Sequence, residues 1–412
     1  MKNNSKYRFI ILATIVLIRL CLGLNWASAG PLIPLIIQAF GISRSSAGWY
    51  ASIAPLTIAA VSLPVNMISA RFGLKKTLAA GVLLMSAGSL ALFTKGYLPL
   101  LLLRALFAVG SALIVPVATA IVAQWFGNRT LPIINGITMS FANLGHGIAF
   151  ATAIPIAMAI SWKAPIIVYG IFTLACGVAW VVLGREHGEG AEKTEIPSRE
   201  TPKAQPELSL RQVLTNRYAL LLTLSVTVSW SLANALNSWL PDYYYTVFSI
   251  PLEEASSILA FSKIGGIAAC ITGGILSTRL GRRKPFLIIS GIFTGIAGLF
   301  SILFNVPAVI YTSVTLFGLF GAIYISSIFT IPMEIPDIPL RSGVIVVAMM
   351  LVGGNLGNFI SPLVIGYLAD VTGSYLPGFI IFIVLSYVLM VAGILLPETG
   401  PRGRRLPGTE LT

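Results

Sequence analysis

The stretch Ser69-Ala-Arg-Phe-Gly-Leu-Lys-Lys76 recurs later in the chain as Ser277-Thr-Arg-Leu-Gly-Arg-Arg-Lys284. An arginine, a glycine and a final basic pair hold the same places in both stretches, which lie 208 residues apart. The same separation relates three apolar pairs, Phe40 with Phe248, Ile42 with Ile250 and Ala47 with Ala255. A repeat of this length in a chain of 412 residues indicates two halves built to one plan.

Around these stretches, apolar residues run in blocks of about 20, the length that an α-helix needs to cross a bilayer. The chain is 56% hydrophobic and 10% charged, whereas a soluble protein carries about 25% charged residues. The sequence therefore predicts an all-α membrane protein. Twelve transmembrane helices are expected, at about 8–30, 46–70, 76–94, 97–123, 131–158, 163–184, 217–241, 255–277, 285–304, 306–331, 343–369 and 375–396.

The expected domains follow from the long polar segment between the sixth and seventh helices. We predict a six-helix bundle at 1–184, a linker at 185–216, a second six-helix bundle at 217–400 and a tail at 401–412. The linker holds six acidic residues with proline and serine, and a short amphipathic stretch is expected at 208–215. A repeated six-helix unit implies a pseudo-two-fold axis along the membrane normal, with a site between the halves.

The charge distribution predicts topology. The net charge is +13, but the basic residues fall between the apolar blocks, so they do not form a nucleic-acid surface. With the linker left out, fifteen basic residues lie near one set of helix ends and three near the other. Basic residues favour the cytoplasm, so the plasma membrane is expected to hold this chain with both termini cytoplasmic.

Three cationic side chains, Arg19, Arg104 and Lys263, fall inside apolar blocks. The first acidic residue of the chain is Glu186, so the first six blocks contain no carboxylate. At 1.5 Å per residue, Lys263 lies about 15 Å and about 24 Å from the two ends of its helix. Ionisable groups at such depth usually mark a pathway or a site. We therefore predict that Lys263 and Arg19 bind an anionic substrate. The alternatives are an interhelical contact for Lys263 and hydrogen bonds to backbone carbonyls for Arg19.

His146 is the one side chain in the predicted membrane interior that titrates near neutral pH. It is a candidate for proton coupling, against the alternative of a hydrogen bond in helix packing. A peripheral acid or a proton carried by the substrate would also provide proton coupling. A counter-anion is the other candidate for the coupling ion.

Amides and aromatic rings on the cavity-facing helices are further candidates for substrate binding. Amides donate to carboxylates, and indole or phenol rings shape a pocket around a small organic body. Interhelical hydrogen bonding is the alternative role for each. The candidates are Asn25, Trp26, Asn234, Asn237, Trp239, Tyr324, Asn355 and Asn358.

The basic stretches resemble the loop signature of the major facilitator superfamily, in which the loop between the second and third helices recurs in the second half. The signature's aspartate, part of a cytoplasmic latch, is replaced by Ala70 and Thr278, which puts that latch in doubt. Arg104 and Gly110 resemble the family's fourth-helix motif, with Ala108 at its other glycine. The resemblance implies structural or gating roles for Arg71, Gly73, Arg104, Gly110, Arg279, Gly281 and Arg282.

The run Asn237-Ser-Trp-Leu-Pro241 is similar to one found in organic-anion and cyanate-type members of that family. The resemblance implies a monomeric secondary transporter that moves a small organic anion, a mono- or dicarboxylate, by alternating access. Its partners would be the substrate, the lipid bilayer and a coupling ion, either a proton or a counter-anion. A drug-efflux pump and a non-transporting sensor on the same fold are the alternatives.

Enzymatic activity is not expected from this sequence. The three cysteines are scattered, without the spacing of metal ligands. No glycine-rich nucleotide loop and no nucleophile–base pair at useful spacing is present. We expect neither a metal site nor a cofactor.

Overall fold

The computed structural model describes residues 4–62, 64–126, 130–186, 210–335 and 338–400. Within these ranges the regular structure is helical, without a strand. Most of the predicted linker, residues 187–209, and the predicted tail at 401–412 lie outside the described residues.

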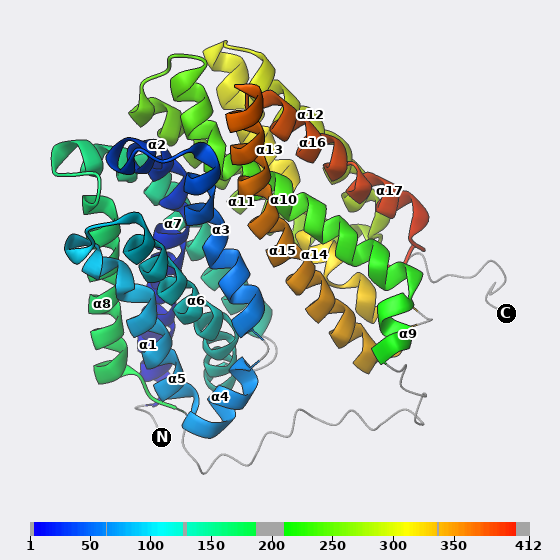
Figure 1. Ribbon diagram of the computed structural model, residues 1–412. Coiled ribbons are helices and arrows are strands. Elements are labelled where there is room, and N and C mark those ends of the chain that lie inside the picture. Colours follow the sequence, from blue (N-terminus) through cyan, green and yellow to red (C-terminus); the bar gives the residue numbers. More distant parts are fainter. Residues whose placement is uncertain (1–3, 63, 127–129, 187–209, 336–337, 401–412) are drawn as a thin grey trace, which may run out of the picture.

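The first half supplies the helices of six predicted crossings (Figure 1). The first crossing is divided into α1 and α2, the second into α3 and α4, and the third ends as the 3₁₀ helix η1. The elements are α1 (Asn4–Ala27), α2 (Ala29–Phe40), α3 (Arg44–Val61), α4 (Val65–Phe72), α5 (Leu74–Met85), η1 (Ser86–Phe93), α6 (Tyr97–Trp125), α7 (Leu131–Ala159) and α8 (Ala164–Leu183).

The second half repeats this plan. The amphipathic stretch predicted at 208–215 forms the short helix α9, and the tenth and twelfth crossings are divided. The elements are α9 (Leu210–Thr215), α10 (Arg217–Thr246), α11 (Leu252–Leu280), α12 (Lys284–Leu303), α13 (Pro307–Ile323), α14 (Ile325–Ile328), η2 (Ile331–Met333), α15 (Leu340–Thr372), α16 (Leu376–Ser386) and α17 (Val388–Leu395). In the described chain, eleven helical stretches are long and apolar enough to cross a membrane; α3 is not among them.

The divisions follow local chemistry. Pro31 and Pro34 lack the N–H groups that would continue the hydrogen bonds of α1, and α2 restarts at Ala29 after Ser28. Pro64 precedes α4 in the same way. Such interruptions inside a membrane are tolerated where neighbouring side chains satisfy the freed carbonyls.

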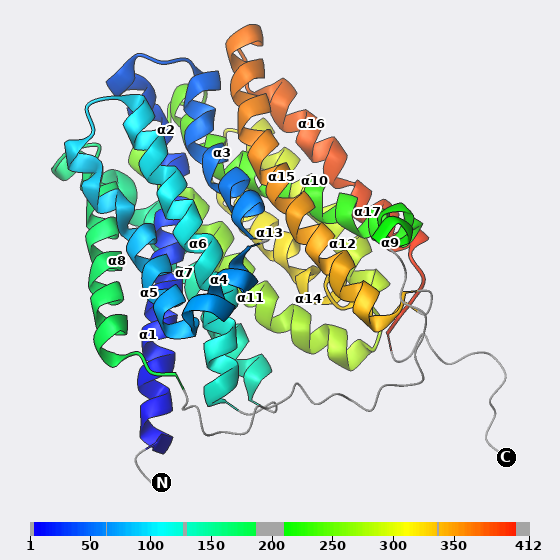
Figure 2. The same ribbon diagram turned by 60° about the horizontal axis from the view of Figure 1, so that its bottom comes forward.

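The two halves lean together at one end and diverge at the other (Figures 1 and 2). We call the end where α1 begins and α8 ends the inner side, and the opposite end the outer side. Helix α3 contacts α15, α7 contacts α11, and α2 contacts α10. These three pairs join the halves.

The hydrophobic core shows the same asymmetry. One buried cluster joins Ala47 and Phe150 of the first half with Trp239 and Ile258 of the second, and it occupies the outer side. Towards the inner side each half has its own cluster, the first around Trp180 and the second around Leu396. The structure is therefore closed on the outer side, while the halves are separately packed on the inner side.

Glycines allow the closest approaches on the outer side. A Cβ atom on Gly30 of α2 would lie 2.1 Å from the Asn237 carbonyl oxygen on α10. A Cβ on Gly366 of α15 would lie 2.7 Å from the Arg44 carbonyl oxygen on α3. Backbone meets backbone at these places, so only glycine permits this closure.

On the inner side, each basic stretch is closed by a carboxylate from the end of its own half. The Lys75 N–H at the start of α5 donates to Glu186 Oε1 at 2.5 Å. In the second half, the Arg283 N–H at the start of α12 donates to Glu398 Oε1 at 2.6 Å. Both acids lie where a helix N-terminus favours negative charge. The two halves therefore repeat this contact as well as the sequence.

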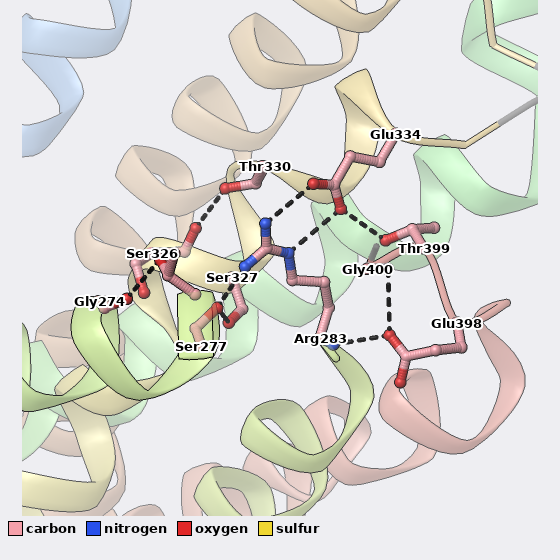
Figure 3. Close-up of polar contacts among 11 residues, drawn as sticks. Gly274, Ser277, Arg283, Ser326, Ser327, Thr330, Glu334, Glu398, Thr399 and Gly400 are labelled. Carbon is pink, nitrogen blue, oxygen red and sulfur yellow. Dashed lines mark hydrogen bonds and ion pairs between the residues drawn. The ribbon is translucent and has the colours of Figure 1, made fainter. Parts of the chain in front are cut away.

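Figure 3 shows the larger network of the second half. The Arg283 guanidinium forms an ion pair with Glu334 at 2.9 Å, and the Thr399 hydroxyl donates to the same carboxylate at 3.0 Å. A Cβ on Gly400 would lie 2.1 Å from the Gly281 carbonyl oxygen, so this turn rests directly on the basic loop. Carboxylates from other parts of the chain, Glu186 in the first half and Glu334 and Glu398 in the second, thus contact the basic stretches.

Replacing Glu398 with alanine is expected to lower the apparent melting temperature of the purified protein by a few degrees. The substitution leaves the first N–H groups of α12 without their carboxylate, a loss of about 0.5–2 kcal/mol. A thermal scan in detergent measures the change. Glu253→Ala, at an exposed position of α11 on the outer side, is the control. Equal melting temperatures for Glu398→Ala and the parent would contradict the capping role.

Candidate functional site

A cavity between the halves divides into two lobes, which share Asn143, Asn237 and Lys263. The interface lobe has a volume of about 120 Å³ and lies where the halves meet. The α12 lobe, of about 180 Å³, extends into the second half. The interface lobe is also lined by Trp26, Gly30, Arg104, His146, Phe150 and Asn234. The α12 lobe is also lined by Ser229, Trp230, Ser262, Thr294, Tyr324 and Ser386.

Lys263 of α11 lies at the junction of the lobes. Its ammonium donates to Asn237 Oδ1 at 3.0 Å and lies 5.5 Å from the ring centre of Phe150. An ammonium carries three donors, and this is its one hydrogen bond among the described residues. No carboxylate of the described chain lines either lobe. The remaining donors are thus free to bind an anion.

Arg104 of α6 reaches the interface lobe but serves the broken first crossing. Its guanidinium donates to the carbonyl oxygens of Asn25 and Trp26, the second at 2.9 Å. These carbonyls lie in the last turn of α1, which ends at Ala27, so the helix itself does not continue their hydrogen bonds. The aromatic rings of Tyr50 and Phe107 lie within 5.2 Å of the guanidinium carbon. A cation at a helix C-terminus is favourable, so Arg104 stabilises the break and adds positive charge to the cavity wall.

His146 and Asn143 line the interface lobe from one face of α7. They are three residues apart, the spacing that brings helical side chains together. The Nδ1 atom of His146 is buried and has no hydrogen-bond partner among the residues that the structure describes. A Cβ on Gly145 would lie 2.2 Å from the Leu20 carbonyl oxygen, so this part of α7 is pressed against α1.

The two lobes bring together five residues of the substrate-binding prediction, with His146 and Arg104 nearby: Lys263, Asn237, Tyr324, Trp26 and Asn234. Arg19 lies apart: it is 2% exposed and donates to the Val115 carbonyl at 3.0 Å, within the first half. This is the type of contact that the alternative reading of Arg19 expected.

The other predicted residues also lie outside the two lobes. The Asn25 amide donates to the Thr173 hydroxyl at 2.9 Å. The Trp239 indole on α10 donates to the backbone carbonyl of Pro362 on α15, also at 2.9 Å. The Asn355 side-chain amide donates to the Leu351 carbonyl of its own helix. The backbone carbonyl of Asn358 accepts a hydrogen bond from the Asn234 side-chain amide. These contacts orient helices. The motif residues Arg71, Arg279 and Arg282 are exposed at the inner side.

Sequence reasoning missed Asn143, Phe150 and Thr294 as cavity residues. Asn143 carried a weak signal, because Asn143-Leu-Gly145 recurs as Asn355-Leu-Gly357. Phe150 and Thr294 carried none, since single aromatic and hydroxyl residues are common throughout membrane helices.

A polar cluster seals the outer side above the cavity. The Arg44 guanidinium donates to the Tyr375 hydroxyl at 2.5 Å, and that hydroxyl donates to Asp242. Burial, together with the Asp242 carboxylate, raises the pKa of Tyr375 above its usual range, so the hydroxyl keeps its proton. Asp370 accepts the backbone N–H groups of Arg44 and Ser45 at 3.1 and 2.8 Å. The cluster ties the start of α3 to α10, to α15 and to Tyr375, which directly precedes α16.

Comparison with protein families gives a match to the model described as Major Facilitator Superfamily, over residues 15–337 and again over 271–411. A probable sulfoacetate transporter of Cupriavidus necator is 26% identical over 91% of this chain and 90% of its own. The hexuronate transporter of Bacillus subtilis is 24% identical over 84% and 85%. The 4-hydroxybenzoate transporter of Pseudomonas aeruginosa is 25% identical over 71% and 72%.

Solved structures agree on the fold. A bacterial homologue of the human lysosomal transporter Spinster, in an inward-facing and unoccupied conformation, superposes with a TM-score of 0.75 at 16% identity. The alignment covers 97% of this chain and 99% of that one. A nucleoside transporter aligns with a TM-score of 0.74 at 13% identity, over 94% and 99% of the two chains. The predicted membrane fold of two six-helix bundles is confirmed.

Proposed function

Since this chain belongs to the major facilitator superfamily, we propose that it is a secondary transporter that carries a small organic anion, a mono- or dicarboxylate, by alternating access. The relatives named for sulfoacetate, hexuronate and 4-hydroxybenzoate transport all handle organic acids. Their shared substrate chemistry supports an organic acid as the substrate here.

The observation that carries the proposal is the Lys263 ammonium, which has one hydrogen bond to the described residues and lies in a cavity whose described lining has no carboxylate. A buried charge without a counter-charge is costly. A bound carboxylate would supply the counter-charge and accept hydrogen bonds from Lys263 and Asn143 together. An efflux pump for cationic drugs would need the opposite charge in this place, so the same observation argues against it.

Alternating access is supported by the asymmetry of the core. The outer side is closed by the cluster around Arg44 and Tyr375, whereas on the inner side each half keeps its own hydrophobic cluster. A rocking motion would break the first contacts and bring the inner ends together. We assign the inner side to the cytoplasm and the membrane to the plasma membrane, on the basis of the basic residues at the inner ends.

Coupling forms part of the proposal. His146 borders the interface lobe and has an unused ring nitrogen, so it is the described group best placed to exchange a proton within the cavity. Exchange against a second anion would need no such group. The protein is proposed to act as a monomer, because one chain contains the whole cavity.

Counterflow into liposomes tests the function. Proteoliposomes loaded with lactate, succinate, oxalate, benzoate or sulfoacetate are assayed for uptake of the same labelled anion, with a sugar and a cationic dye as controls. Saturable exchange of an organic anion is expected. Exchange of only the dye would favour the efflux pump, and absence of exchange for every compound would favour the sensor.

Asp370→Asn is expected to loosen the outer seal. The carboxylate accepts two backbone N–H groups, and hydrogen bonds to charged groups contribute about 1.5–3 kcal/mol. A cysteine introduced in place of the buried Ala47 should then react about tenfold faster with an impermeant maleimide added from outside. Glu253→Gln, an exposed carboxylate on the same side, is the control. An unchanged labelling rate in Asp370→Asn would contradict the role of the seal.

A further inference from the structure

Thr294 of α12 has an unused hydroxyl inside the α12 lobe. Threonines in helices commonly donate to the carbonyl four residues earlier, and here Thr227, Thr272 and Thr315 all do so at 2.7–2.8 Å. Thr294 is 7% exposed, and its Oγ1 atom has no hydrogen-bond partner in the described part of the chain. Buried polar groups are rarely left in this state. The hydroxyl is therefore available to a molecule that enters the lobe.

The surroundings of Thr294 orient it. A Cβ on Gly321 of α13 would lie 3.8 Å from the Thr294 methyl carbon, so the methyl group faces the glycine. Just beyond Gly321, α13 ends at Ile323, and Tyr324 lies at the break before α14. Tyr324 and Thr294 both line the lobe. Helix breaks of this kind accompany binding sites in transporters, because the interrupted backbone faces a wet cavity.

The lobe also has a defined size and a polar wall. Its volume is about 180 Å³. The Ser262 and Ser386 hydroxyls donate to carbonyls of their own helices, which leaves their oxygens as acceptors. Within the described lining, the wall thus offers the Lys263 ammonium and the unbonded hydroxyls of Thr294 and Ser229 as donors, and acceptors on other faces. A short body with an oxygen that accepts a hydrogen bond from Thr294 matches this arrangement.

We infer that the transported anion is a short hydroxy- or oxo-carboxylate. This inference rests on the proposed function. The carboxylate binds where the lobes join, at Lys263, Asn237 and Asn143, and the body extends into the α12 lobe. There its hydroxyl or carbonyl oxygen accepts a hydrogen bond from Thr294. Thr294 is thereby a specificity-determining residue, which separates oxygenated anions from their alkyl analogues.

Competition with matched anions tests the inference. Propionate is compared with lactate and pyruvate, and butyrate with 3-hydroxybutyrate, as competitors of counterflow in the parent, Thr294→Val and Thr294→Ser. A site that bonds a hydroxyl discriminates strongly against an analogue that lacks it. The parent should prefer the oxygenated member of a pair by at least about tenfold. Thr294→Val should reduce that preference to about onefold without changing the affinity for the alkyl acid, and Thr294→Ser should keep it.

Thr315→Val is the matched control, because the Thr315 hydroxyl is bonded within its own helix and lies outside both lobes. It should leave the preference unchanged. Equal competition by both members of each pair, or an equal loss for both in Thr294→Val, would overturn the inference while leaving anion transport intact. Absence of exchange for every anion would instead overturn the proposed function.

Discussion

Lys263→Gln is expected to reduce anion exchange by at least about a hundredfold. The substitution removes the positive charge at the junction of the lobes, and no cation in the described chain takes its place beside Asn237. A carboxylate would then lose the cation that binds it directly, because the guanidinium of Arg104 on the same wall is bonded to the Asn25 and Trp26 carbonyls. A buried charge that loses its partner costs several kcal/mol, and each 1.4 kcal/mol corresponds to a factor of ten. Counterflow and calorimetric binding to the purified protein measure the loss.

The fold should tolerate this change, because a glutamine amide can still donate to the side-chain oxygen of Asn237. Lys263→Arg keeps the charge and should retain part of the activity, while Lys95→Gln, at an exposed outer position, serves as the control. Exchange by Lys263→Gln within twofold of the parent would remove Lys263 from the site. Arg19→Gln is the companion variant. A loss of exchange at normal thermal stability would support the predicted binding role of Arg19, despite its contact with Val115.

Gly30→Ala is expected to abolish exchange by preventing closure of the outer side. Its Cβ atom would lie 2.1 Å from the Asn237 carbonyl oxygen and 3.3 Å from the Ser238 Cα atom. Both obstacles are backbone, so no side-chain rotation relieves the overlap. The halves should separate at this end, and a cysteine at Ala47 should become open to an impermeant maleimide from outside.

Two further glycines make this experiment specific. Gly366→Ala, with its Cβ 2.7 Å from the Arg44 carbonyl oxygen, should give the same result from the other helix pair, away from the lobes. Gly136→Ala adds a methyl group where nothing lies within 4 Å, and it should exchange normally. If Gly366→Ala transports at the parental rate, the close approach is not needed for the cycle.

Sequence patterns predicted what depends on repetition and hydropathy. The recurrence of the basic stretch located both halves, and apolar blocks located the crossings, because these properties are carried by many residues at once. Lys263, which lines both lobes, was selected from the sequence because a lone ammonium at membrane depth is rare. The role of Arg104 was harder to see: its partners are backbone carbonyls, exposed only because α1 ends at Ala27.

The carboxylates of the inner side were missed for a related reason. Glu186 was counted among the six acidic residues of the linker, and no pattern in the sequence singled out Glu398. Each acts on a helix start more than a hundred residues earlier in the chain. The unbonded hydroxyl of Thr294 could not be predicted from the sequence. Only the geometry of its neighbours distinguishes it from a threonine hydroxyl that is bonded to its own helix.

The placement of these two acids has a consequence for how the protein is made. The helix start at Lys75 leaves the ribosome 111 residues before Glu186, the acid that closes it. At about 5–20 residues per second, that start waits roughly 6–22 s for its partner. The second half repeats the delay, with 115 residues between Arg283 and Glu398. Each bundle therefore completes this contact only when residues at the end of its half have been made. Translation that stops within a half leaves the helix start of that half without its carboxylate.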